Sequence, residues 1–154
     1  MELTGNSSES DCKNTGIPQD SIDGLSRRLA KFTVSFALPH APTEALENAK
    51  LAILDCLGVS LLALTQEIGE ALLRYARANY SSGLCTIWGS SFTAGLRDAA
   101  FFNGTLAHAI DFDDGGHATT YTLAAALAAA EFRRASGKAT LEAFIAGREV
   151  RSCL

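Results

Sequence analysis

Acidic and imidazole side chains are concentrated in one short stretch of an otherwise apolar chain. The stretch, residues 105–122, reads TLAHAIDFDDGGHATTYT. Its acidic and imidazole residues are His108, Asp111, Asp113, Asp114 and His117. Burying an unpaired carboxylate is costly, so their position between two apolar segments indicates a polar corner with a specific role.

Four interpretations fit these residues. In a purely structural corner, the aspartates cap helix ends, Gly115 and Gly116 turn the chain, and His108 packs within a helix. The D-x-D-D-x-x-H spacing from Asp111 to His117 offers hard oxygen ligands and an imidazole for a divalent metal. A carboxylate and a histidine on one loop can also move a proton at a carbon next to a substrate carboxylate. The fourth interpretation is a non-catalytic interaction module whose apolar helices bind another chain.

Helical periodicity dominates the chain on both sides of this stretch, because apolar residues recur at three- and four-residue steps. We predict six helices, the first from Ser21 to before Pro39 and the others near residues 43–64, 66–79, 93–109, 119–136 and 139–152. Between Gly83 and Gly89, β-favouring residues indicate a short extended segment. The predicted fold class is therefore mainly α, with at most one short strand.

The N-terminal segment and the cysteines indicate the cell compartment in which the protein is expected. Residues 1–20 are polar and rich in Ser, Asn and Gly, so we predict a disordered leader. They lack the apolar core of a signal peptide and carry acids that a transit peptide avoids. The 4 cysteines show no CxxC spacing, which suits a reducing compartment. We expect a cytoplasmic protein, with the mitochondrion as the alternative.

Composition argues against two classes of partner. The 13 Lys and Arg residues are outnumbered by 17 Asp and Glu residues, and the net charge of −4 does not favour nucleic acid. The apolar run LAILDCLGVSLLAL contains Asp55 and is shorter than the roughly 18 residues of a membrane span. We expect a buried helix there, with no membrane contact.

Four segments resemble, in order, motifs of the MmgE/PrpD family. The family stretch H-x-x-D-[FY]-D-D, followed by a histidine before an Ala- and Leu-rich helix, is similar to residues 108–117. AKLAILDCLGVSLLAL resembles the family helix with an I-L-D-x-L-G core, TIWGSS resembles the segment before the active-site helix, and AFIAGREV resembles the A-x-x-x-G-x-E-V helix after it. Residues 21–154 are therefore expected to form the N-terminal part of the family's helical domain.

The resemblance implies a lyase that acts on a small di- or tricarboxylate by proton transfer, without a metal or another cofactor. It further implies an all-helical domain joined to a smaller α+β domain, and a homodimer. Asp111 matches a position implicated in catalysis, and His117 matches the histidine credited with proton transfer. His108, Asp113 and Asp114 are expected to bind substrate or to support the corner. We expect activity like 2-methylcitrate dehydratase first and like cis-aconitate decarboxylase second.

Departures from the family pattern leave the exact substrate open. Gly115 stands where some members carry Thr, and Ala118 rather than Pro follows His117. The family's substrate-binding basic residues fall beyond Leu154, and we expect the Arg and Lys residues outside the motif on solvated faces. The 154-residue chain alone is therefore expected to be inactive. The alternative is a non-catalytic helical fragment that pairs with a full-length relative.

Overall fold

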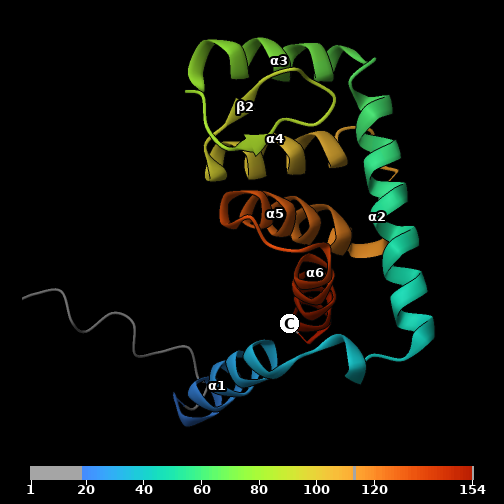
Figure 1. The fold of residues 1–154 in the computed structure, drawn as a ribbon, viewed down its shortest axis with the longest axis vertical. Helices are drawn as coiled ribbons and strands as arrows, with labels where there is room; N and C mark the ends of the chain where they lie inside the picture. The colour runs from blue at the N-terminus through green and yellow to red at the C-terminus, as the bar shows by residue number, and fades with distance from the viewer. Residues whose placement is uncertain (1–18, 113, 154) are drawn as a thin grey trace, which may run out of the picture.

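The computed structural model describes residues 19–112 and 114–153, and these are mainly helical (Figure 1). The elements are α1 (Gln19–Ser35), the 3-10 turn η1 (Leu38–His40), α2 (Thr43–Ala63), α3 (Glu67–Asn79), β1 (Cys85–Thr86), β2 (Thr93–Ala94), α4 (Leu96–His108), η2 (Gly115–His117), α5 (Ala118–Arg133) and α6 (Gly137–Ser152). The mainly α class is confirmed. The predicted leader, residues 1–20, lies outside the described residues except for its last two positions, which begin α1.

The helices form a stack with one helix along its side. Figure 1 shows α3, the two strands, α4 and α5 in successive layers, with α2 running alongside them. Contacts join α3 to α4, α4 to α5 and α5 to α6, and α2 touches α4, α5 and α6. Helix α1 packs against α6 at the far end. The corner between α4 and α5 is therefore held within the middle of the stack.

Small residues allow α4 and α5 to pack closely. Phe102 and Leu106 of α4 and Leu123 of α5 are fully buried, and alanines fill the space between them. A Cβ added to Gly104 would stand 3.5 Å from the Ala124 Cβ, an ordinary van der Waals distance, so α4 lies directly against α5 at this position. This close packing fixes the end of α4 relative to the start of α5, and these two helix ends flank the polar corner.

The structure contains two short strands rather than at most one. β1 and β2 pair antiparallel, with Cys85 opposite Ala94. β2 occupies the start of the segment predicted as helix 93–109, and α4 begins only at Leu96. The Thr93 hydroxyl donates to the Gly83 carbonyl at 2.7 Å, and a side chain at Gly83 would overlap the Ala94 backbone. Pairing with β1 therefore replaces the first helical turn.

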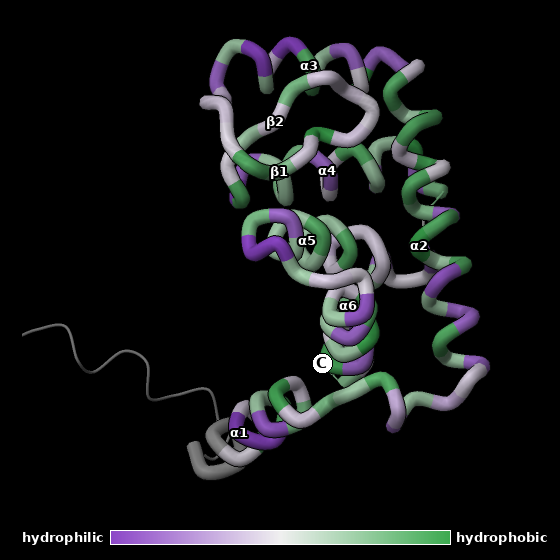
Figure 2. Tube along the Cα trace, in the orientation of Figure 1, coloured by the Kyte–Doolittle hydropathy of each residue, from purple (hydrophilic) through white to green (hydrophobic). Residues whose placement is uncertain are grey.

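Helix α2 is not the buried helix that its apolar sequence predicted. Its buried residues are mostly small: Ala49, Cys56, Ser60 and Ala63. By contrast, four leucines are about half to two-thirds exposed: Leu51, Leu54, Leu61 and Leu62. Small residues let one face of α2 lie close to its neighbours, while the leucines project elsewhere. Figure 2 shows hydrophobic positions recurring along α2 at the side of the stack.

Among the helices of residues 19–112 and 114–153, none is by itself both long and apolar enough to span a bilayer. By length and composition alone, α2 and α3 meet the requirement together, but the pair is bent by 86°.

Asn103 joins α4 to the segment that follows β1. This buried side chain accepts a hydrogen bond from the Trp88 N–H at 3.0 Å and donates one to the Thr86 carbonyl at 2.9 Å. Buried backbone groups require such partners, since leaving one unpaired is costly. Asn103 therefore anchors the layer of strands to the helix that carries His108.

Replacing Asn103 with Ala should lower the free energy of unfolding by about 2 kcal/mol, because the buried Trp88 N–H loses its acceptor. Urea unfolding followed by Trp88 fluorescence measures the change. The matched control is Asn79→Ala, since the exposed Asn79 amide donates only to the Tyr75 carbonyl of its own helix. We expect a loss below about 0.5 kcal/mol for that variant. Equal losses in the two variants would contradict the anchoring role.

Candidate active site

Both candidate catalytic residues have left-handed backbone conformations that non-glycine residues rarely adopt. Asp111 has φ 57° and His117 has φ 58°, and the third such residue in the described ranges is Arg134, after the end of α5. Asp and His enter this region more readily than most residues. Backbone outliers of this kind concentrate at functional sites. The polar corner therefore differs from an ordinary helix–helix connection.

Local hydrogen bonds shape the corner on both sides. His108 is the last residue of α4, and its carbonyl accepts a hydrogen bond from the Asp111 N–H at 3.1 Å. The His117 N–H donates to the Asp114 carbonyl at 2.8 Å and closes η2. Gly116, with φ 77°, supplies a conformation that glycine adopts without strain. The chain thus reverses direction and returns His117 to the end of α4.

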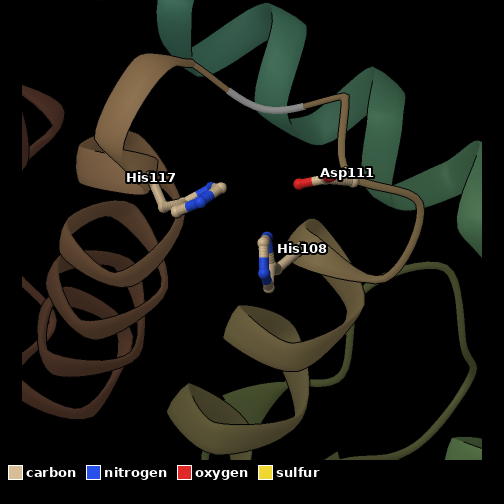
Figure 3. A group of neighbouring side chains, drawn as sticks. All are labelled: His108, Asp111 and His117. Atoms are coloured by element: carbon tan, nitrogen blue, oxygen red, sulfur yellow. The ribbon is translucent and has the colours of Figure 1, made fainter.

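Three side chains converge across this reversal. Figure 3 shows His117 and Asp111 facing one another from opposite sides of the corner, with His108 between them at the end of α4. The two imidazole rings lie edge to face, with centroids 4.3 Å apart. One nitrogen of each histidine and one Asp111 carboxylate oxygen lie within 4.8 Å of one another. Such a group can exchange a proton with a bound molecule or bind a metal ion.

Asp114 is engaged in a different set of contacts. One carboxylate oxygen accepts a hydrogen bond from the Thr119 N–H at 3.0 Å, and the other accepts one from the Thr119 hydroxyl at 2.8 Å. The second oxygen also lies 2.8 Å from the Arg148 guanidinium. Asp114 therefore ties the first turn of α5 to α6. The remaining site prediction, Asp113, falls outside the described residues.

The expectation that basic residues outside the motif lie on solvated faces is wrong for Arg148. Its half-buried guanidinium pairs with Asp114 and lies 5.9 Å from the centre of the Phe144 ring. Gly147 makes this approach possible, because a side chain there would overlap Thr122 of α5. Sequence reasoning missed this contact, and the signal that could have predicted it is the glycine next to the arginine in AFIAGREV, because a residue without a side chain permits a close approach.

A second contact from α6 reaches the corner at Gly116. The Gly116 carbonyl accepts a hydrogen bond from the Tyr121 hydroxyl at 3.1 Å and a longer one from Arg151 at 3.4 Å. This carbonyl belongs to the residue directly before His117. The backbone that orients the His117 side chain is therefore held by both α5 and α6.

An open apolar groove adjoins His108. It has a volume of about 580 Å³ and runs between α4 and α5. Exposed aromatic side chains of both helices, Phe101 and Tyr121, line it, and Ile68 of α3 closes one side. The groove places hydrophobic surface directly next to the imidazole pair.

Two described residues on other parts of the fold, Cys85 and Tyr80, have raised pKa values. Burial raises the pKa of the Cys85 thiol, and the nearby Glu131 charge raises it further. The thiol donates to the Ala128 carbonyl at 3.2 Å. Burial also raises the pKa of Tyr80, with a smaller contribution from Asp98. A buried thiol with a raised pKa is a poor nucleophile, so Cys85 is a core residue.

Comparison with known proteins gives consistent matches. Residues 27–154 match the MmgE/PrpD N-terminal domain. Cis-aconitate decarboxylase of Mus musculus is 32% identical over 142 residues, which cover 82% of this chain and 29% of the mouse protein. Cis-aconitate decarboxylase of Homo sapiens is 33% identical over 107 residues, covering 64% of this chain and 22% of the human protein. The chain thus spans less than a third of either relative, and it belongs to the MmgE/PrpD family through the N-terminal domain.

Proposed function

We propose that this chain provides the proton-transfer corner of a lyase that acts on a small di- or tricarboxylate. The observation that carries the proposal is the convergence of Asp111, His117 and His108 within 4.8 Å. Asp111 and His117 both reach it from left-handed backbone positions. The family membership and the names of the two relatives support the choice of lyase chemistry.

The proposed reaction is a decarboxylation completed by protonation. The bond between a substrate carbon and one carboxylate breaks, carbon dioxide leaves, and the electron pair remains on the substrate as a carbanion delocalised into a neighbouring carboxylate. His117 donates a proton to that carbon and is reprotonated by Asp111 or by water. His108 lies close enough to donate a hydrogen bond to a substrate oxygen. The chemistry uses protein groups alone, and we propose that it requires no metal or organic cofactor.

We propose decarboxylation as the first candidate reaction and dehydration as the second, which reverses the order expected from the sequence. Both relatives are cis-aconitate decarboxylases. Dehydration of a 2-methylcitrate-like substrate is the second candidate, because it also requires a proton transfer at a carbon next to a carboxylate. The apolar groove beside His108 can accept an alkyl substituent, which favours keeping this candidate.

The conservative variants Asp111→Asn and His117→Asn should lower turnover of cis-aconitate by the whole protein about 100-fold or more, because neither amide transfers a proton. Asparagine tolerates a positive φ, so both variants keep the backbone of the corner. Product formation is followed by NMR, with 2-methylcitrate tested in parallel.

The control for these variants is His40→Gln, which changes the third histidine, exposed in η1 away from the corner. This control should retain full turnover. Wild-type activity should also survive dialysis against a chelator. Full activity in either asparagine variant, or a loss on chelation that a divalent ion restores, would refute the proposed chemistry.

Arg148→Met should lower kcat of the whole protein about tenfold, because Arg148 positions the turn before His117 through Asp114. Arg148→Lys should recover part of the loss. The double variant Asp114→Asn/Arg148→Met should be little slower than Asp114→Asn alone if the pair acts as one unit. Arg74→Met is the control, since Arg74 pairs with Glu70 on an exposed face of α3. Additive losses of kcat in the double variant would show that Arg148 acts independently of Asp114.

The 154-residue chain alone should neither bind nor turn over cis-aconitate. A tricarboxylate needs cationic partners, and the basic residues that contact the described part of the corner are Arg148, which already pairs with Asp114, and Arg151. Isothermal titration calorimetry and NMR provide the measurements. Saturable binding, or turnover that disappears in His117→Asn, would show that these residues suffice.

A further inference from the structure

We propose that His108, Asp111 and His117 also form a binding site for one divalent first-row transition-metal ion, such as Zn²⁺, Co²⁺ or Ni²⁺. The three side chains offer two imidazole nitrogens and one carboxylate oxygen within 4.8 Å of one another. His108 and Asp111 are exposed and His117 is half-buried.

The spacing suits a tetrahedral ion after small side-chain rotations. Zinc binds nitrogen and carboxylate oxygen at about 2.0–2.2 Å, so bound donor atoms stand roughly 3.5 Å apart. Bringing donors that are now up to 4.8 Å apart to that spacing requires rotations of the His108, Asp111 and His117 side chains. Three protein ligands leave the fourth position to water, as in zinc sites that remain open.

The donor set selects against magnesium and calcium. Those ions prefer six or more oxygen ligands, whereas the described members of this group are one carboxylate and two imidazoles. Asp114, which the D-x-D-D-x-x-H spacing would include, has both carboxylate oxygens engaged by Thr119 and Arg148. The proposed site therefore omits Asp114, which the D-x-D-D-x-x-H spacing includes, and adds His108, which lies before that spacing.

The backbone preorganises this donor set. Asp111 and His117 hold their positions through left-handed φ angles, and η2 and its hydrogen bonds fix the chain between Asp114 and His117. The Gly116 carbonyl is held in turn by Tyr121 and Arg151. These contacts hold the described parts of the corner in place, which lowers the entropic cost of binding an ion.

Metal binding and the proposed lyase chemistry use the same atoms but do not depend on one another. An ion on His117 would block proton transfer, so in the whole protein it should act as an inhibitor. Binding to the 154-residue chain is measurable whether or not that chain has any activity. Failure of one proposal therefore leaves the other intact.

The test uses the 154-residue chain after removal of metals with a chelator. Titration calorimetry with ZnCl2 and NiCl2 should show one ion per chain, and MgCl2 should give no saturable binding. Co²⁺ should produce visible absorption bands of a tetrahedral site with nitrogen and oxygen ligands. His108→Gln, Asp111→Asn and His117→Asn should each weaken binding by at least about tenfold.

Two controls address exposed groups of the described residues that also bind these metals. His40→Gln removes the third histidine, and Cys153→Ser removes an exposed thiol. Both should bind as tightly as the wild type, and circular dichroism should show unchanged helix content in every variant. The proposal is overturned if wild type shows no saturable binding, if a control variant weakens it as much as a ligand variant, or if the cobalt spectrum shows thiolate charge transfer.

Discussion

The close packing of α4 against α5 is the constraint on which the candidate site depends. α4 and α5 are in contact, and Ala124 and Ala128 of α5 are buried. The chain reverses between His108 at the end of α4 and Ala118 at the start of α5. Asp111, Gly116 and His117 take positive φ angles within this reversal. The packing of the two helices thus sets the ends of a reversal in which an acid and a histidine face one another.

Helix positions were predictable because apolar periodicity reports on local structure. The predicted helix 43–64 corresponds to α2, Thr43–Ala63. Periodicity does not indicate how many faces of a helix are covered by neighbouring helices. The exposure of Leu51 and Leu54 was therefore not predicted. The strand Thr93–Ala94 was missed for a related cause. Its conformation depends on a pairing partner near Gly83, and a local helical pattern contains no trace of that contact.

The site was predictable in its residue types but not in its contacts. The resemblance to the MmgE/PrpD motif singled out Asp111 and His117, and a carboxylate and an imidazole at a corner suit proton transfer. Spacing alone, however, grouped Asp114 with them, although that carboxylate faces Thr119 and Arg148. The ion pair joins Asp114, which precedes η2 and α5, to Arg148 in the second half of α6. Only the packing of α6 on α5, which Gly147 permits, brings them together.

Backbone strain at Asp111 and His117 is offset by contacts in the neighbouring turn. Each non-glycine residue with a positive φ costs on the order of 1–3 kcal/mol, and neither Asp111 nor His117 is buried in the core. Compensation comes from the neighbouring turn, where Asp114 binds Thr119 and Arg148. Because the Arg148 guanidinium pairs with Asp114 in these contacts, its charge is not available to a ligand. Positive charge for an anionic ligand must therefore come from groups other than the one that stabilises the corner.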